Sequence, residues 1–540
     1  MTASMFTMVL VAAPIVSGLL LVLSLPSFDL GFIAWFGLSP LLFALRQRGP
    51  LVAAALGFLF GCVFGGGSFA WLNLVPSITI SRFFLMVAAF SVFYLVFGLV
   101  YNLVRRTLGG WAILAGPAAW VALEYARASF SILALPWNFL GHSQYRYLPL
   151  IQIADLTGVY GISFLVATIN QLLSELPALL TGPGVARWRA LTIPRTTWAI
   201  QLVIVVVLAV STLLYGWQRL AASEAGDHLR VALVQGNLRP RNPMPAREQM
   251  EHLRIYERLT REAAKEKPDV IVWPSSSVPG PFELWTVRLY LSRIAFQAGS
   301  YLLVGGSGGD KFAPPKDGHA PYSNSQFLIS PSGSLEGQYN KMRLTPFAEY
   351  LPLYGTITWP RYITALERGY VPGETYTLLE VSGARFGTPI CWESAFPDLF
   401  RCFVLAGAHF MVSVTNEAEF GASSAPYQTL AMSVFRAVEN RRVVARAATT
   451  GVSAFIDPKG KIFARISDSN GKDVFVSGVA VQDVRLSTER SFYTLYGDVF
   501  AQALSAVVLL VIVTSLVRRR RRSQQLSGGT EPAPSMSRAG

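Results

Sequence analysis

One cysteine, Cys391, stands where an apolar segment ends and a segment with helix-starting residues begins. The stretch from Arg385 to Ile390 has the pattern of a short buried strand, while Pro397 and Asp398 are typical of a first helical turn. This order predicts a sharp turn that exposes the thiol. A thiol with a pKa of about 8.5 is mostly protonated at neutral pH, so nucleophilic chemistry needs a neighbouring cation or base and donors for an oxyanion. The alternative is a buried structural cysteine.

Candidate partners for this thiol lie between Tyr339 and Pro352. Lys341 follows a predicted strand, and Glu349 comes after it, beyond Pro346. A lysine ammonium beside the thiol would lower the thiol pKa and stabilise an oxyanion, and a carboxylate could orient the lysine or accept a proton. Lysine and glutamate are also the ordinary residues of protein surfaces, so this segment alone is more typical of a solvated loop.

The composition combines a membrane protein with a water-soluble block. Hydrophobic residues make up 52% of the chain and charged residues only 14%. The apolar runs cluster before Trp217 and after Tyr496, which leaves the block between them outside the membrane. The three cysteines are scattered and form no CxxC, so we expect no disulfide framework, no metal site and no cofactor. The expected parts are a membrane domain over residues 1–217, a catalytic domain over 228–485, a transmembrane helix over 496–517 and a disordered basic tail over 518–540.

The apolar runs are long enough for about eight transmembrane helices, seven before the soluble block and one after it. The first run lacks a basic n-region and a cleavage site, so we expect it to be retained. Arginines concentrate in alternate loops, at Arg46, Arg105 and Arg187, and in the run Arg518 to Arg522. The positive-inside rule then puts both termini in the cytoplasm and the soluble block outside it. The net charge of +14 reflects this topology and contact with anionic lipid, and nucleic-acid binding is not expected.

The soluble block alternates strands and helices in an α/β pattern, which predicts a two-layer sheet sandwich flanked by helices. The expected helices are Pro245–Lys265, Pro281–Ala298 and Tyr427–Asn440. The expected strands are Leu229–Gln235, Asp269–Trp273, Tyr301–Gly305, Ser323–Ser330, Gly337–Tyr339, His409–Val414, Val443–Ala448, Val452–Asp457, Ile462–Ile466 and Val474–Val481.

The loop between the fifth and sixth predicted spans is long and rich in aromatic residues, Pro and Gly. We expect it to form an aromatic belt at the bilayer surface. The alternative is direct substrate contact by Trp137, Asn138 or His142.

Four motifs together carry a resemblance to a known family. They are VALVQGN at Val231–Asn237, VIVWP at Val270–Pro274, TNEAEFG at Thr415–Gly421 and the Cys391 segment. In this order they resemble the nitrilase superfamily, in which a Glu, a Lys and a Cys act on an αββα sandwich. The predicted spans and RSFYTLYGDVF at Arg490–Phe500 make the chain similar to the bacterial apolipoprotein N-acyltransferase family.

The resemblance implies catalytic roles for four positions. Cys391 matches the nucleophile, Lys341 the catalytic lysine and Glu349 a supporting carboxylate. The general-base Glu of the family is replaced here by Ser275. A hydroxyl cannot hold the thiol proton at neutral pH, so another group must cover this role if the protein is active.

The resemblance also implies substrate contacts. Trp392 and Glu393 match the aromatic and acidic pair after the nucleophile, and Phe420 matches a family phenylalanine. Glu419 stands where the family has a tryptophan, and Met244 lies about where it has another.

The implied reaction transfers an acyl chain from a membrane phospholipid through a Cys391 thioester to the amine of a diacylglyceryl-cysteine on an apolipoprotein. The implied place is the bacterial inner membrane, with the catalytic domain on the periplasmic side. Two alternatives stay open. One is a catalytically degraded paralogue that binds lipoprotein or lipid, which Ser275 favours, and the other is a membrane-tethered amidase.

Overall fold

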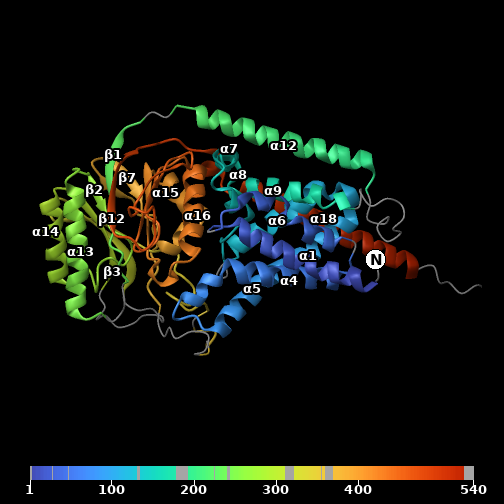
Figure 1. The fold of residues 1–540 in the computed structure, drawn as a ribbon, viewed down its shortest axis with the longest axis horizontal. Coiled ribbons are helices and arrows are strands. Elements are labelled where there is room, and N and C mark those ends of the chain that lie inside the picture. The colour runs from blue at the N-terminus through green and yellow to red at the C-terminus, as the bar shows by residue number, and fades with distance from the viewer. Residues whose placement is uncertain are drawn as a thin grey trace, which may run out of the picture.

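The computed structural model has a helical bundle and a mixed α/β sandwich lying side by side (Figure 1). The basic loop with Arg187 and Arg189 and the end of the predicted tail lie outside the described residues. The described residues are 3–26, 28–46, 48–130, 134–177, 193–223, 226–239, 244–309, 322–353, 355–358, 360 and 369–527.

The bundle is built from apolar helices that approach closely at small residues. A side chain at Gly57 of α4 would meet the carbonyl oxygen of Tyr94 at 2.1 Å, and one at Gly98 of α5 would meet that of Ala53 at 2.2 Å. Glycine therefore allows α4 and α5 to pack backbone to backbone. The helices are α1 Ala3–Ser24, α2 Ala34–Gly37, α3 Ser39–Leu45, α4 Pro50–Ser68, α5 Ile80–Leu108, α6 Ala112–Ser129, α7 Leu148–Ile151, α8 Ala154–Thr157, α9 Val159–Leu173, α12 Arg195–Ala221, α17 Phe492–Tyr496 and α18 Val499–Ser527.

Within the described residues, four helical runs are long and apolar enough to cross a membrane, or five if the pair Leu148–Thr157 and Val159–Leu173, bent by 119°, counts as one. The run Ile80–Ser129 folds back on itself between α5 and α6. The evidence is that the ring centres of Phe97 in α5 and Trp120 in α6 lie 5.1 Å apart. Shorter apolar helices cover Leu10–Ser24 and Gly31–Leu45. The apolar helical character is confirmed, and the number of about eight spans stays a prediction.

The sandwich consists of two six-stranded sheets, in the orders β12-β1-β2-β3-β4-β5 and β11-β10-β9-β8-β7-β6. The helices α13 and α14 lie on the first sheet, and α15 and α16 on the second, with α16 on the side of the bundle (Figure 1). This confirms the predicted αββα sandwich. Its elements are β1 His228–Gln235, α13 Ala246–Ala264, β2 Val270–Val272, α14 Trp285–Ala298, β3 Tyr301–Gly308, β4 Ser323–Ile329, β5 Leu335–Asn340, β6 Leu379–Val381, β7 Ala384–Gly387, α15 Pro397–Leu405, β8 Phe410–Thr415, α16 Ala425–Asn440, β9 Val444–Ala448, β10 Ala454–Ile456, β11 Ile462–Arg465 and β12 Gly478–Arg485.

Three local predictions differ from the structure. The short strand β6 was not predicted; it pairs with β7 through a two-residue turn in which Ser382 and Gly383 both have positive φ, as hairpin turns require. The last strand begins at Gly478 rather than Val474. The predicted disorder from residue 518 is wrong up to Ser527, because α18 continues through the arginine run, and arginine is a good helix former.

A buried ion pair and buried hydrogen bonds join the bundle to the sandwich. Arg441, at the end of α16, donates to Asp155 of α8 at 2.6 Å and to Gln152 at 2.7 Å. Both charged side chains are at most 4% exposed. Glu439 of α16 accepts a hydrogen bond from the backbone of Val159 at 3.1 Å. The second sheet and its helix are thereby held in one orientation toward the bundle.

Candidate active site

Cys391 sits on a strained turn between the second sheet and α15. Ile390 is extended and bridges Val414 of β8, and Cys391 itself has φ of 52°, a left-handed value that costs a non-glycine residue about 1–3 kcal/mol. A 3-10 turn, Cys391–Ala395, leads into α15. The thiol is partly exposed, and its Sγ lies 3.8 Å from the carbonyl oxygen of Asn416. The predicted exposing turn is present, with a 3-10 turn at the predicted helix start.

Lys341 and Glu349 form a buried pair beside this turn. Lys341 follows β5, and its Nζ lies 2.5 Å from Oε2 of Glu349; the two side chains are 1% and 13% exposed. Glu349 also accepts hydrogen bonds from the backbone of Thr345 at 2.7 Å and from the amide of Asn324 at 2.9 Å. The Glu349 carboxylate therefore orients the lysine, which is one of the two roles that the sequence predicts for this carboxylate.

The charges at this pair favour the ionised forms. Burial lowers the pKa of Lys341, but the Glu349 carboxylate and the negative charge of an ionised Cys391 outweigh burial, so the lysine pKa lies above its usual value. Burial raises the pKa of Glu349, but the Lys341 ammonium and the hydrogen bonds outweigh it, so the carboxyl pKa lies below its usual value. An ammonium that stays charged next to the thiol stabilises a thiolate and an oxyanion.

Glu393 fastens the nucleophile turn to the lysine loop. Its Oε1 accepts from the hydroxyl of Tyr339 at 2.8 Å and from the backbones of Met342 and Arg343 at 2.8 and 3.0 Å, and its Oε2 accepts from Ile390 at 2.7 Å. The residue is 0% exposed, and burial raises the pKa of its carboxyl. This geometry gives Glu393 a positioning role, although the family resemblance implied a substrate contact.

Ser275, at the position of the missing base, is 1% exposed and follows β2. A side chain added at Gly305 would meet the Cα of Ser275 at 2.8 Å and the Nε2 of Gln326 at 2.5 Å, so Gln326 reaches toward Ser275. Among the described residues, neither amide atom of Gln326 has a hydrogen-bond partner, and the residue is 0% exposed.

Sequence reasoning missed Gln326, although a signal existed. In β4, Asn324 and Gln326 occupy alternate positions and so share one face, and Asn324 binds Glu349. A polar side chain at the next position on that face of a buried strand indicates the same site.

A second missed group supports the loop that faces the thiol. Arg446 of β9 donates to Glu417 at 2.6 Å, with both side chains 0% exposed. The backbone of Glu417 donates to Thr449 at 3.2 Å, whose hydroxyl donates to the side chain of Asn416 at 3.0 Å. These contacts fix Asn416, the residue whose carbonyl lies near Cys391.

An aromatic column connects the nucleophile turn with the bundle. The ring of Trp392 stacks on Trp137 at 5.6 Å, Trp137 lies 5.8 Å from Trp71, and Trp71 lies 4.7 Å from Phe420. Trp137 is 3% exposed, and its indole donates to Gln428 of α16 at 2.8 Å. The expectation that Trp137 belongs to an aromatic belt at the bilayer surface is therefore wrong, because the side chain is buried against the sandwich.

The remaining predicted substrate positions are more dispersed. Glu419 is exposed in the 3-10 turn Ala418–Phe420, directly before Phe420 of the aromatic column. Met244 is 9% exposed and precedes α13. Substrate contact by either residue stays a prediction.

Comparison with known proteins places these features in a family. The family described as "Apolipoprotein N-acyltransferase N-terminal domain" matches residues 17–172, and "Carbon-nitrogen hydrolase" matches residues 230–491. An apolipoprotein N-acyltransferase of Geobacter metallireducens is 38% identical over 91% of this chain and 92% of its own. The chain belongs to the apolipoprotein N-acyltransferase family.

Other relatives agree with this assignment. The apolipoprotein N-acyltransferases of Chlorobaculum tepidum and Azotobacter vinelandii are each 30% identical, over 90% and 83% of this chain and 92% and 85% of their own. A nitrilase-superfamily amidase from Nesterenkonia aligns with 52% of this chain and 95% of its own at 19% identity and a TM-score of 0.35, too distant to support an inference. The family membership makes the chain an acyltransferase of the nitrilase superfamily and resolves its class in favour of a transferase.

Proposed function

We propose that this protein transfers an acyl chain from a membrane phospholipid to the α-amine of a diacylglyceryl-cysteine at the N-terminus of an apolipoprotein. The observation that carries the proposal is the stack of Trp392 on Trp137. This stack places the residue after the nucleophile directly against the membrane bundle. A water-soluble enzyme has no membrane bundle, so the contact is specific to an enzyme that works at a membrane. Both proposed substrates are lipids, so a nucleophile that faces the bundle suits them.

In the proposed first half-reaction, the Sγ of Cys391 attacks the ester carbonyl carbon of the phospholipid. The ammonium of Lys341 stabilises the oxyanion of the tetrahedral intermediate, and Glu349 holds that ammonium in place. The carbon–oxygen ester bond then breaks, the lysophospholipid oxygen takes up the thiol proton, and a thioester remains on Cys391.

In the second half-reaction, the amine of the diacylglyceryl-cysteine attacks the thioester carbonyl. The carbon–sulfur bond breaks, the amine proton returns to the thiol, and an amide is formed. Ser275 cannot be the base that moves these protons, because a serine hydroxyl is neutral at working pH. We assign this task to a water held by Ser275 and Gln326, which relays the proton to Glu349.

The proposed site of action is the inner membrane, with the sandwich on the periplasmic side. The long apolar helices support a membrane location, and the alternation of arginine-rich loops supports the sidedness. In this arrangement the active site meets lipoproteins after their export.

Mass spectrometry tests the chemistry directly. The purified protein, incubated with phosphatidylethanolamine, should carry one acyl group on Cys391, and addition of a diacylglyceryl peptide should discharge it as an N-acylated product. Cys391→Ala should form no acyl-enzyme, while Cys402→Ala should behave as wild type, because Cys402 lies within α15. Acylation at another residue would refute the role of Cys391. Release of free fatty acid in preference to peptide acylation would favour the amidase alternative.

A further inference from the structure

Three side chains behind the nucleophile carry buried donors without acceptors. Among the residues that the structure describes, no hydrogen-bond partner exists for the three guanidinium nitrogens of Arg127, for Nδ2 of Asn138 or for Nε1 of Trp71. Arg127 is 1% exposed, Asn138 2% and Trp71 8%. Buried polar groups in proteins are nearly always paired. These five donor nitrogens outnumber the one unpaired carboxylate oxygen in this part of the bundle, Oε2 of Glu124, and such an excess of donors points to a bound group that is rich in acceptors.

Arg127 lies in the last turn of α6, between two aromatic rings. Its Cζ is 5.0 Å from the ring centre of Phe90 and 5.2 Å from that of Phe139. The ring faces attract the cation, but they accept none of its five N–H donors in the plane of the guanidinium. The rings therefore hold the guanidinium in place and leave its hydrogen-bonding edge without a partner.

The bundle pairs other buried arginines, which makes Arg127 an exception. Arg46 and Arg105 both form ion pairs with Glu175. The carboxylate nearest to Arg127 in sequence is that of Glu124, whose Oε1 accepts from the indole of Trp120 at 2.9 Å and from the backbone of Leu140 at 2.7 Å. Within the described part of the chain, no ion pair of 4.0 Å or less joins Glu124 to Arg127, and the second carboxylate oxygen, Oε2, is itself buried without a hydrogen-bond partner.

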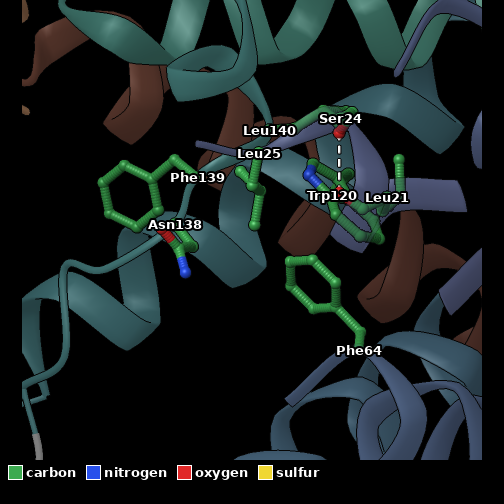
Figure 2. A pocket seen from close by; sticks show the side chains of 8 residues that line it. All are labelled: Leu21, Ser24, Leu25, Phe64, Trp120, Asn138, Phe139 and Leu140. Carbon is green, nitrogen blue, oxygen red and sulfur yellow. Dashed lines mark hydrogen bonds between the residues drawn. The ribbon is translucent and has the colours of Figure 1, made fainter. Parts of the chain in front are cut away.

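Asn138 lines a small pocket at the same place. It has φ of 50°, a left-handed value, and it shares the pocket with Phe139, the ring that Arg127 covers (Figure 2). Figure 2 shows the amide nitrogen of Asn138 directed away from the ring of Phe139. The full lining is Leu21, Ser24, Leu25, Phe64, Trp120, Asn138, Phe139 and Leu140.

The pocket and the aromatic column are connected through two residues that are adjacent in the chain. Asn138 directly follows Trp137, which stacks on Trp392 beside the nucleophile. The indole nitrogen of Trp71, whose ring belongs to the column, also has no hydrogen-bond partner among the described residues. A molecule that reaches both Cys391 and Arg127 would pass along this row of rings.

We propose that Arg127 and Asn138 bind the phosphate group of the acyl-donor lipid. The inference rests on the proposed function for the identity of the lipid as donor. A planar guanidinium binds two phosphate oxygens at once, and the Asn138 amide offers a further donor to a third. The acyl ester of the same lipid then lies toward Cys391 along the aromatic column. A free phosphate ion has the same acceptors, but the position of Arg127 inside an apolar bundle favours a lipid.

Native mass spectrometry of the full-length Cys391→Ala protein tests the site without requiring turnover. The protein, released from nanodiscs of phosphatidylglycerol and phosphatidylethanolamine, should retain one phospholipid. Arg127→Gln in this background should lower the retained fraction by about tenfold or more, as loss of a charge-assisted hydrogen bond implies. Arg127→Lys should restore part of the retention because it keeps the charge. Arg146→Gln, at a side chain that is 58% exposed, should retain lipid as the parent does.

Asn138→Asp provides a second variant of nearly identical shape. It replaces the amide donor by a negative charge, and aspartate tolerates the left-handed backbone, so the fold should be kept while phosphate is repelled. Circular dichroism and the melting temperature check the fold of each variant. Equal retention of lipid by the parent and by folded Arg127→Gln and Asn138→Asp would overturn the proposal.

Two further arms separate the possible sources and the possible failures. Inorganic phosphate alone should not raise the melting temperature of the detergent-solubilised parent; a rise that Arg127→Gln abolishes would assign the site to free phosphate and overturn the lipid. The second arm uses proteins that retain Cys391. A galactolipid donor with the same acyl chains should acylate wild type and Arg127→Gln at equal rates, whereas the phospholipid should acylate wild type about tenfold faster than Arg127→Gln. Arg127-dependent retention without any acylation would contradict the proposed function and support the phosphate site.

Discussion

At the scale of single residues, the site depends on one ammonium held by one carboxylate. Lys341 is 1% exposed, and the only strong anionic contact described for its Nζ is Glu349 at 2.5 Å. Since burial alone would disfavour the charged lysine, the carboxylate is what keeps the cation available to the thiol. The chemistry and the local stability therefore rest on the same pair.

Lys341→Met tests the catalytic part of that role. It removes the cation next to Cys391, so the rate of acyl-enzyme formation should fall by about 10²- to 10³-fold, as for loss of one oxyanion donor. The measurement is single-turnover acylation of Cys391 by mass spectrometry. Lys341→Arg, which keeps the charge, should recover part of the rate. A folded Lys341→Met protein with near-normal acylation would show that the lysine is structural.

Glu349→Gln tests the pH dependence. The pKa of Glu349 is lowered in the folded protein, so its stabilising contribution is present above the unfolded value of about 4.3 and is lost as the pH falls through the folded pKa. The difference in melting temperature between wild type and Glu349→Gln should be large at pH 7 and should shrink below about pH 4. Breaking a buried pair costs about 3–5 kcal/mol. A difference that does not change with pH would show that the pair does not titrate as described.

Ser275→Glu tests the replacement of the family base. The unpartnered amide of Gln326 reaches toward Ser275, so a glutamate there gains a donor and would accept the thiol proton. We expect acyl-enzyme formation at neutral pH to rise by at least about tenfold, within the range of general-base catalysis.

Ser275→Gln is the matched control for shape, because it adds the same volume without a base. It should not exceed the wild-type rate. Burst-phase kinetics with melting temperatures distinguish the outcomes. A slower and less stable Ser275→Glu protein would mean that the pocket is built around serine and that the added carboxylate is an uncompensated buried charge.

At the scale of elements, helix α16 is the support on which the two parts of the molecule meet. All but one of the 16 residues of this helix are buried, the exception being the half-buried Tyr427, whereas α13 and α14 have exposed faces. Its end carries Arg441, in a left-handed conformation with φ of 50°, and the guanidinium reaches Asp155 in the bent helix pair. Packing and charge together fix the direction in which Cys391 faces.

Arg441→Gln tests this connection. It leaves the buried Asp155 with less compensation, so the free energy of unfolding should fall by about 3–5 kcal/mol. Thermal unfolding in nanodiscs measures the loss. Arg230→Gln is the control, because Arg230 is 46% exposed in a pair 3.7 Å from Glu266, and surface pairs contribute about 0–1 kcal/mol. A similar small effect of both variants would show that the interface does not depend on the buried pair.

At the scale of the whole molecule, the arrangement of bundle and sandwich suits a reaction between a lipid and a lipoprotein at the membrane surface. The bundle and the sandwich lie side by side; α12 runs along the bundle toward the sandwich, and α18 runs the opposite way, to the far end of the bundle (Figure 1). A catalytic sandwich fixed to apolar helices in this way samples the membrane surface rather than the bulk solution. Its sidedness is therefore part of the function.

Cysteine labelling tests the sidedness. In a variant in which Cys62, Cys391 and Cys402 are replaced by alanine, an added cysteine at the exposed position Glu336 of β5 should react with a membrane-impermeant maleimide in intact spheroplasts. A cysteine at Arg520, in α18, should react only after permeabilisation. The reverse pattern would place the sandwich in the cytoplasm and contradict the topology.

The sequence by itself determined the features that depend on local pattern. Hydrophobic runs separated the bundle from the sandwich, strand alternation gave most strands to within a few residues, and the Cys391 turn and the Lys341 segment were recognised from residue types and order. These features follow from periodicity and turn chemistry, which act over a few residues.

Only the tertiary structure decided which groups share the site. Trp137 is far from Trp392 in sequence and stacks on it, and Glu393 turns inward to fasten two loops. Gln326 of β4 and Ser275 after β2 both lie close to Gly305 of β3, the strand between them, and Arg127 has no acceptor among the residues that the structure describes. Each of these contacts depends on how sheet, helix and bundle pack together. Residues that are distant along the chain then decide whether a buried polar side chain finds a hydrogen-bond partner. Local pattern contains no record of those partners, because burial and pairing are properties of the packed molecule.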